Sequence, residues 1–454
     1  MKNILLINPW IYDFTAYDLW SKPLGLLYLG AHLRKQGCRI FLLDCLDRQS
    51  DLANPGIKRG SRVLRDYGCG NYQKTRLPKP DLLNMIPRYW GRYGITFAQV
   101  VNHLKSLPKP QAIMITCGMT YWYPGAVAMQ RITSLLWPRV PIFLGGVFAA
   151  LCPDFARQFG FFEVIETSDP LLMCERLESQ LGINLNVSGY EDFFSVHPAF
   201  DLYSDPYYAV VTTSIGCPFR CSYCASGRLL PNFWQRDPID VYEEIRALVQ
   251  GRGIQDIAFY DDALLFHAER CFVPLLEQVL SKGLKFRLHL PNSIHARYIT
   301  PEIARLMREA GVRTIRISLE GIQEPVLKKS QEKVDLNVFT DAVDALLYAG
   351  YERKEIGVYL LFGLPGIMEN EYRSTLDTVL RMGLHPKLSL YSPIPGTEDW
   401  RHVSWLSEKS DPLYQNKTVT LYLAGLDRLY EELVLVQSGK IKPEGAQSLV
   451  RGME

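Results

Sequence analysis

The chain has 454 residues, of which 47% are hydrophobic and 22% charged, an ordinary composition for a folded protein of two or three domains. Its formal net charge of +2 excludes a strong overall attraction to nucleic acid or to an anionic membrane. No run of 18 apolar residues occurs, so no membrane-spanning helix is expected.

The first residues predict a buried strand from Lys2 to Asn8, an apolar run too short for a signal peptide. Ten cysteines without such a signal indicate a reducing, cytoplasmic setting rather than a framework of disulfides. Continuous apolar strands alternate with helices over residues 1–183, which predicts an α/β domain with a doubly wound parallel sheet. The other predicted strands are Arg39 to Asp44, Ala112 to Thr116, Pro141 to Leu144 and Phe162 to Glu166, with helices at Leu24 to Gln36 and Leu171 to Leu181.

Ligands of such sheets bind beyond the carboxyl ends of the strands, so the loops at that edge form a candidate site. The loops begin at Asn8, Cys117 and Gly145. None of them carries the G-x-G-x-x-G pattern of dinucleotide-binding domains. Gly145 and Gly146 by themselves fit a tight turn as well as they fit a binding site.

Residues 48–110 do not fit the sheet and are predicted to form an insertion between its second and third strands. The insertion is basic, and two interpretations fit it. It is either a helix and loop exposed to solvent, or a lid that contacts a pyrophosphate-like cofactor tail or a phosphorylated substrate. Its basic residues are Lys58, Arg59, Arg62, Arg65, Lys74 and Arg76.

Residues 184–206 are rich in Asp, Ser, Pro and aromatic residues without a clear period, and we interpret them as a linker. From 207 to 400, strands and helices alternate six times, which predicts a partial (β/α)6 barrel rather than the eight units of a closed barrel. Residues 401–454 are predicted to form a helical extension, with one helix from Val419 to Gln437 that packs on the barrel, or that gates substrate or binds a partner. The predicted barrel strands are Tyr207 to Ser214, Ile254 to Tyr260, Lys285 to Leu290, Arg313 to Leu319, Glu355 to Phe362 and Pro386 to Tyr391.

Polar residues and turns gather where these six strands end, which is where catalytic residues of βα barrels lie. Three cysteines, Cys217, Cys221 and Cys224, follow the first strand at the spacing C-x3-C-x2-C. Three thiolates on one short loop can hold three corners of an iron–sulfur cube and leave the fourth iron open, whereas such clusters normally take four cysteines. Structural zinc, which wants four ligands at paired spacings, and buried unreactive cysteines are the alternatives.

This spacing, with Tyr223 directly before the last cysteine, resembles the motif of the radical S-adenosylmethionine (SAM) enzymes. The resemblance implies a [4Fe-4S] cluster on the three cysteines, whose open iron chelates the amino and carboxylate groups of SAM. Two further stretches resemble the second-strand and fourth-strand motifs of that family, whose residues contact SAM, although carboxylates there also fit helix caps or salt bridges. The SAM-binding residues that the resemblance and the strand ends suggest are Tyr223, Tyr260, Asp261, Asp262, Asn292, Ser318, Glu320 and Pro395, with Lys328 or Lys329 as a basic neighbour.

An α/β domain directly before a radical SAM motif resembles the cobalamin-binding domain of the cobalamin-dependent radical SAM enzymes. There the glycine pair makes room for the nucleotide tail of the corrinoid, and a Ser or Thr near the end of the third strand meets its base. The corresponding candidates are Thr120, Tyr121, Gly145, Gly146 and Val147. The chain departs from the D-x-H-x-x-G cobalamin motif, because its first histidine is His32, within a predicted helix. We therefore expect no histidine of the protein as the lower ligand of cobalt.

The resemblance implies that a reduced [4Fe-4S] cluster cleaves SAM to a 5′-deoxyadenosyl radical, which removes a hydrogen atom from an unactivated carbon. Cobalamin then delivers a methyl group, which makes the chain a C-methyltransferase for a small molecule or a peptide. A flavodoxin or ferredoxin is the implied electron donor, and neither a membrane nor nucleic acid is an expected partner. Two alternatives remain: a cobalamin-dependent rearrangement or cyclisation without methyl transfer, and a non-catalytic corrinoid or Fe–S binding protein.

Overall fold

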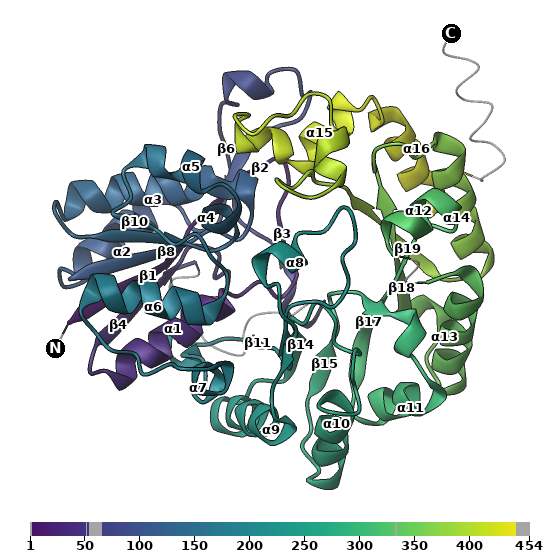
Figure 1. The fold of residues 1–454 in the computed structure, drawn as a ribbon, viewed down its shortest axis with the longest axis horizontal. Coiled ribbons are helices and arrows are strands. Elements are labelled where there is room, and N and C mark those ends of the chain that lie inside the picture. Colours follow the sequence, from purple (N-terminus) through teal and green to yellow (C-terminus); the bar gives the residue numbers. More distant parts are fainter. Residues whose placement is uncertain (1, 51, 54–65, 332–333, 442–454) are drawn as a thin grey trace. The chain divides into compact units, whose positions relative to one another are not determined.

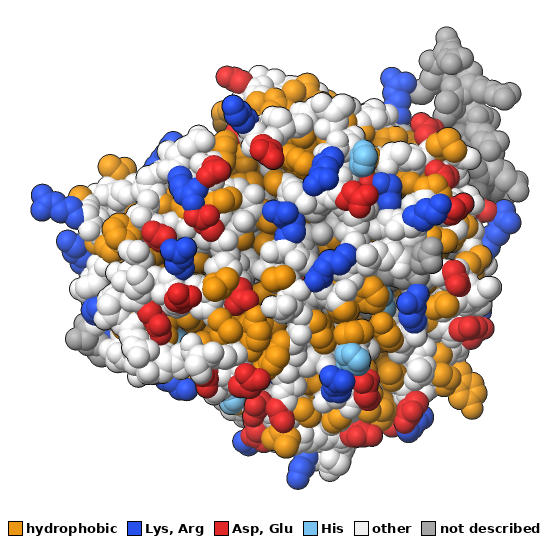
Figure 2. Space-filling model, viewed as in Figure 1, with side chains coloured by type: hydrophobic (Ala, Val, Ile, Leu, Met, Phe, Trp, Pro, Cys, Tyr) orange, Lys and Arg blue, Asp and Glu red, His pale blue; other side chains and the backbone are white. Residues whose placement is uncertain are grey.

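The computed structural model describes residues 2–50, 52–53, 66–331 and 334–441, and the chain divides into two compact units. The first unit comprises residues 1–211, 239–258 and 409–414, and the second comprises residues 212–238, 259–408 and 415–454. Lys58, Arg59, Arg62 and Arg65 of the predicted basic insertion lie outside the described residues. On the face drawn in Figure 2, acidic and basic side chains are interspersed, as the small net charge leads one to expect.

The first unit contains a parallel sheet of five strands, the class that the sequence predicts (Figure 1). Its order is β10-β9-β8-β1-β4, so the strand that comes first in the sequence lies inside the sheet. Ile4, for example, is paired with Ile40 on one side and with Ala112 on the other. The strands are β1 (Asn3–Asn8), β4 (Arg39–Asp44), β8 (Ala112–Thr116), β9 (Ile142–Gly145) and β10 (Glu163–Val164). The main helices around them are α1 (Leu24–Lys35), α2 (Phe97–Ser106), α3 (Tyr123–Leu136) and α6 (Pro170–Leu181).

The segment predicted as an insertion is more ordered in its described part than the sequence suggests. Helix α2 begins at a capping box, in which the Thr96 hydroxyl accepts from Gln99 N and the Gln99 side chain accepts from Thr96 N. Val100 and Leu104 of this helix are fully buried, so α2 belongs to the core of the unit. Before it, short strands form two small antiparallel sheets, one ordered β2-β7-β6 and the other pairing β3 with β5. These strands are β2 (Ile11–Asp13), β3 (Tyr17–Asp18), β5 (Gly70–Asn71), β6 (Lys74–Arg76) and β7 (Gly91–Tyr93).

The predicted linker also proves to be packed. It contains helix α7 (Tyr190–Phe194), and Phe193, Phe194 and Phe200 are buried. The hydroxyl of Tyr203 donates to Asp44 at 2.7 Å, which ties the segment to the end of β4. Sequence composition missed this order because aromatic residues without a period carry no helix or strand signal.

The six barrel strands expected from the sequence are all present, and they alternate with helices as in a partial βα barrel. In the first unit β11 (Tyr208–Val211) lies beside β14 (Asp256–Phe259), whose last residue falls in the second unit. In the second unit the order is β15-β17-β18-β19, with β16 also paired to β17. These strands are β15 (Arg287–His289), β16 (Ile294–His295), β17 (Val312–Glu320), β18 (Ile356–Phe362) and β19 (His385–Leu390).

Some helices of the barrel begin at residues whose side chains cap them. Thr300 accepts from Ile303 N at the start of α11 (Pro301–Glu309), and Asp335 accepts from Val338 N at the start of α13 (Leu336–Tyr348). The other helices are α8 (Ser226–Leu229), α9 (Pro238–Arg246), α10 (Phe272–Ser281), α12 (Glu324–Lys329) and α14 (Glu369–Arg381).

The single helix expected over Val419 to Gln437 is wrong, because the structure has two. Helix α15 (Lys417–Leu423) ends before Gly425, whose φ of 68° lies in the left-handed region that ends helices, and α16 (Asp427–Gln437) follows. Leu429, Leu433 and Val436 are buried, so the apolar stripe of the second helix packs against the protein. Among the described residues, no helix combines the length and the apolar character needed to cross a membrane.

Candidate functional site

A cavity of about 330 Å³ in the second unit brings together all three cysteines of the C-x3-C-x2-C motif. We call it the cysteine cavity. Cys217 and Cys221 are buried, whereas Cys224 is exposed. The Sγ atom of Cys224 accepts from the backbone N–H of Ser226 at 3.5 Å.

The donor set fits an iron–sulfur cube better than a single ion. Within the described part of the chain, no three His, Cys, Asp or Glu side chains are arranged as ligands of one metal ion. A cube takes one thiolate at each of three different irons, so its ligands surround the cluster and need not point at a single metal position. The three cysteines on the wall of one cavity are the residues that could hold it.

Five of the predicted SAM-binding residues line the cysteine cavity: Tyr223, Asp262, Asn292, Ser318 and Glu320. They come from the cysteine loop, from the segments that follow β14 and β15, and from the last residues of β17, so the ends of separate strands meet. Burial raises the pKa of Tyr223, and the Glu320 carboxylate raises it further, so this phenol stays protonated. The cavity therefore offers carboxylates, an amide and hydroxyl groups to a charged ligand.

Glu320 has an unusual backbone. It lies at the end of β17 with a φ of 61°, after an irregularity in the pairing between Ser318 and Glu320. A residue other than glycine in the left-handed region costs roughly 1 to 2 kcal/mol, and such costs gather at functional sites. The strain redirects the chain at the position where Glu320 lines the cavity.

Tyr260, Asp261 and Pro395 do not line the cavity. The Asp261 carboxylate is buried and accepts from Thr213 Oγ1 and Ser214 Oγ, each at 2.6 Å, just before the cysteine loop. It also accepts from the backbone N–H of Thr213, so its role is to fix the segment that precedes Cys217. Burial raises the pKa of Asp261, against the effect of these hydrogen bonds.

Sequence reasoning missed several residues that line the cavity: Phe219, Ser293, His295, Tyr359 and Ser389. Phe219 stacks on His295 with ring centroids 4.2 Å apart, which joins the cysteine loop to β16. Tyr359 and Ser389 lie within β18 and β19 rather than at the strand ends, and only the register of the strands brings them to the cavity.

The cysteine loop is held in place by two segments distant in sequence. Ser222 N donates to Lys329 O at 2.9 Å, and Ser222 Oγ donates to Asp399 Oδ2 at 2.5 Å. Asp399 is fully buried, its backbone N–H donates back to Ser222 O, and its carboxylate forms an ion pair with Lys329. Lys329 is thus engaged in an ion pair, and Lys328 pairs with Glu324 on the surface.

We expect Asp399→Asn to lower the free energy of unfolding by about 2 kcal/mol, because it leaves the Lys329 ammonium without its counterion. Urea denaturation monitored by circular dichroism measures the change. Asp344→Asn, at an exposed position of α13, is the matched control and should change stability by less than about 0.5 kcal/mol. Equal stability of the two variants would contradict the anchoring role of Asp399.

A second cavity, of about 270 Å³, lies in the first unit at the carboxyl ends of β8 and β9. Its walls are mostly apolar and come from the start of α1, from these two strands and from α6. The predicted Gly145, Gly146 and Val147 line it, and we call it the glycine slot. A Cβ on Gly146, whose φ is 87°, would approach Cys117 O to 2.7 Å, so only glycine lets the chain pass here.

Thr120 and Tyr121 do not line the glycine slot and are buried elsewhere in the unit. Thr116, at the end of β8, is the residue that provides a hydroxyl group to the slot in place of Thr120. Strand β8 corresponds to the third strand predicted from the sequence. Thr167 and Ser168 add further hydroxyl groups from the segment before α6. A hydroxyl at the strand end was part of the expected pattern, but the sequence alone did not tell Thr116 from Thr120.

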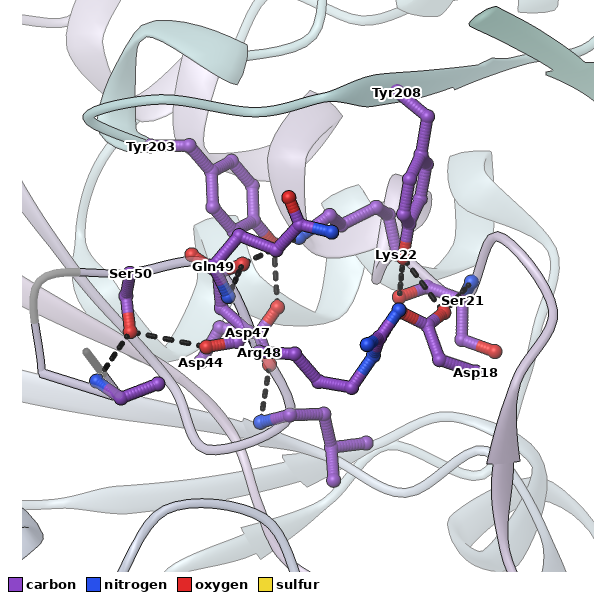
Figure 3. Close-up of polar contacts among 12 residues, drawn as sticks. Asp18, Ser21, Lys22, Asp44, Asp47, Arg48, Gln49, Ser50, Tyr203 and Tyr208 are labelled. Atoms are coloured by element: carbon purple, nitrogen blue, oxygen red, sulfur yellow. Dashed lines mark hydrogen bonds and ion pairs between the residues drawn. The ribbon is translucent and has the colours of Figure 1, made fainter. Parts of the chain in front are cut away.

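The start of α1, which lines the glycine slot, is held by a buried ionic cluster (Figure 3). Lys22 pairs with Asp47 at 3.1 Å, and its ammonium lies 4.0 Å from the ring centroid of Tyr203. Burial by itself would lower the pKa of Lys22, but the carboxylates of Asp47, Asp44 and Asp18 raise it, so Lys22 stays charged. Tyr208 donates to Asp18 at 2.7 Å, which anchors the start of β11 to the same cluster.

Comparison with known proteins agrees with this geometry. Residues 211–379 match the model of the radical SAM superfamily. This chain is therefore an enzyme that contains a radical SAM domain. Over most of its length the chain has the fold of the radical SAM enzymes TsrM and OxsB, an α/β domain followed by the radical SAM domain.

Two solved structures share this fold. TsrM from Kitasatospora setae, a radical SAM methyltransferase, is 16% identical with a TM-score of 0.62, and the match covers 88% of this chain and 75% of TsrM. The cobalamin-dependent SAM radical enzyme OxsB is 13% identical with a TM-score of 0.55, covering 92% of this chain and 56% of OxsB.

Curated relatives are distant. An uncharacterized methyltransferase of Pyrococcus horikoshii is 22% identical over 340 residues, which are 68% of this chain and 72% of the relative. The anaerobic magnesium-protoporphyrin IX monomethyl ester cyclase of Cereibacter sphaeroides is 24% identical over 196 residues, and the match covers 42% of this chain and only 31% of the cyclase.

Proposed function

We propose that this chain is a cobalamin-dependent radical SAM methyltransferase that modifies an unactivated carbon of its substrate. The observation that carries the proposal is the presence of two separate cavities at the carboxyl ends of parallel strands, each lined by the residues its cofactor needs. TsrM, which shares the fold, has been solved with cobalamin and a [4Fe-4S] cluster bound. The relative in Pyrococcus horikoshii is described as a methyltransferase.

When bound, the cluster supplies the electron for cleavage of SAM, and cobalamin supplies the methyl group. The protein's part is to hold and orient these groups. Cys217, Cys221 and Cys224 hold the iron, while Asp262 and Glu320 offer negative charge toward the positively charged SAM. Tyr223 remains a neutral hydrogen-bonding group beside them.

The glycine slot suits the flat base of the cobalamin nucleotide tail. Leu24, Phe143 and Met173 give it apolar walls, and Thr116 provides a hydroxyl. An aromatic base gains most by leaving water for such walls, at roughly 25 cal/mol for each Å² of apolar surface removed from water. A small-molecule or peptide substrate and a low-potential donor such as a flavodoxin or ferredoxin complete the proposal.

A second candidate is a rearrangement or cyclisation without methyl transfer, which the similarity to a cyclase favours. Two products separate the possibilities. Anaerobic protein reconstituted with iron, sulfide and cobalamin is reduced with dithionite and given SAM that carries a labelled methyl group. We expect release of 5′-deoxyadenosine, and label in the corrinoid fraction.

The outcomes of this experiment are distinct. Release of 5′-deoxyadenosine without label in the corrinoid fraction would contradict methyl transfer and support the second candidate. If neither product forms, the chain is a non-catalytic binding protein and both candidates are wrong.

A further inference from the structure

Three neighbouring strands of the second unit carry basic residues on the face that lines the cysteine cavity. Strands β17, β18 and β19 are parallel, with Arg316 opposite Gly357 and Gly357 opposite His385. Two residues further on, Ser318 lies opposite Tyr359 and Tyr359 opposite Lys387. Paired residues share a face, and so do residues two apart along a strand. Because Ser318, Tyr359 and Ser389 line the cavity, Arg316, His385 and Lys387 lie on that same face.

Gly357 makes room for the Arg316 side chain. A Cβ on Gly357 would lie 2.6 Å from Arg316 Nη1 and 2.7 Å from Arg316 Cδ, so the arginine lies directly over the glycine. Arg316 Nη1 donates to Ile315 O at 3.0 Å. Burial raises the pKa of the Tyr359 hydroxyl, and the nearby Arg316 charge lowers it. The arginine is therefore fixed against β18, on the side from which β19 presents Lys387 and His385.

Lys387 is half-buried, and among the described residues it makes neither an ion pair nor a hydrogen bond. Burial lowers the pKa of Lys387, and the nearby Arg316 guanidinium lowers it further. The pKa of His385 is likewise lowered by burial, by the charge of Lys387 and by the charge of Arg316. Charged side chains are rarely removed from water without a partner, and two adjacent cations repel each other, so this arrangement favours an anion.

We propose that Arg316 and Lys387 form a binding site for a carboxylate or phosphate group of the substrate. A guanidinium binds either group through two parallel hydrogen bonds, and an ammonium adds a point charge. Lys387 and Ser389 are two residues apart on β19, a separation of roughly 7 Å, so the site adjoins the cysteine cavity. The substrate class is then a small acid, held by its anionic group while a carbon several bonds away faces the cavity.

This inference deepens the proposed function, on which its reference to a substrate rests, but the site itself can be tested without any cofactor. Purified full-length protein is titrated with inorganic phosphate and, separately, with acetate at constant ionic strength, by isothermal calorimetry and by thermal unfolding. We expect both the wild type and Lys387→Arg to bind one of these anions. Lys387→Gln should lose about tenfold in affinity, as for loss of one hydrogen bond to a charged group.

Lys354→Gln is the matched control, because Lys354 is exposed and already paired with Glu352. It should bind the anions like the wild type. The anion preferred tells whether the substrate group is a phosphate or a carboxylate. Unchanged affinity in Lys387→Gln, or no binding by the wild type, would overturn the site.

Failure of the proposed function has a different signature. Wild-type protein that binds phosphate at this site but neither cleaves SAM nor transfers its methyl group would retain the site and refute the function. If the wild type cleaves SAM and transfers its methyl group, but Lys387→Gln binds phosphate as tightly as the wild type, the site is refuted and the function is retained.

Discussion

Cys221→Ala is expected to remove the iron–sulfur cluster and with it the cleavage of SAM. Cys221 is buried and lines the cavity, and its loss leaves one iron of the cube without a protein ligand. Changes to residues that merely support a metal ligand cost 10- to 100-fold in affinity or activity, so loss of a ligand itself should exceed about 100-fold. Iron and sulfide content, visible absorption and released 5′-deoxyadenosine measure the effect.

Cys152→Ala is the matched control, since Cys152 is a half-buried cysteine that does not line the cysteine cavity. It should retain the iron content and the 5′-deoxyadenosine release of the wild type. A Cys221→Ala protein with a full complement of iron and undiminished cleavage would remove the basis for the whole assignment. Loss of iron from both variants would point to general instability and would also count against a specific role of Cys221.

Gly145→Leu is expected to weaken cobalamin binding by about 100-fold while the fold is kept. No heavy atom lies within 4 Å of the position that a Cβ on Gly145 would take, and the φ of Gly145 is not in the left-handed region. The Cβ of the leucine therefore causes neither a clash nor backbone strain. Because Gly145 lines the glycine slot, the leucine would occupy space that we assign to the nucleotide base. Overpacking costs 1 to 3 kcal/mol, so affinity should fall by about 100-fold.

Gly251→Leu is the control, because Gly251 is exposed and a Cβ there would also have no neighbour within 4 Å. Titration with cobalamin, followed by absorbance, should give wild-type affinity for this control. Gly146 is a poorer target, since any side chain there strains the backbone and collides with Cys117 O. Wild-type affinity in Gly145→Leu would refute the slot as the cobalamin site, whatever the result for the cluster.

Both units follow the alternation of strands and helices seen in the sequence. Runs such as the one from Ile4 to Ile7 are apolar throughout, as buried parallel strands are. Periodicity is a local property that needs no knowledge of distant contacts. The boundaries were less well predicted. Gly425 divides the last helix, and the aromatic segment taken for a linker is packed, with the Tyr203 hydroxyl donating to Asp44.

The sequence by itself determined the three-cysteine motif and the family it resembles, because a ligand set on one short loop is defined by spacing alone. Only the tertiary structure decided which polar residues meet. Asp262 lines the cavity while its neighbour Asp261 bonds to Thr213, and Thr116 rather than Thr120 reaches the glycine slot. Arg316 and Lys387 are 71 residues apart and become neighbours through the register of three strands. That register is set by packing and hydrogen bonding between distant segments, which local sequence does not encode.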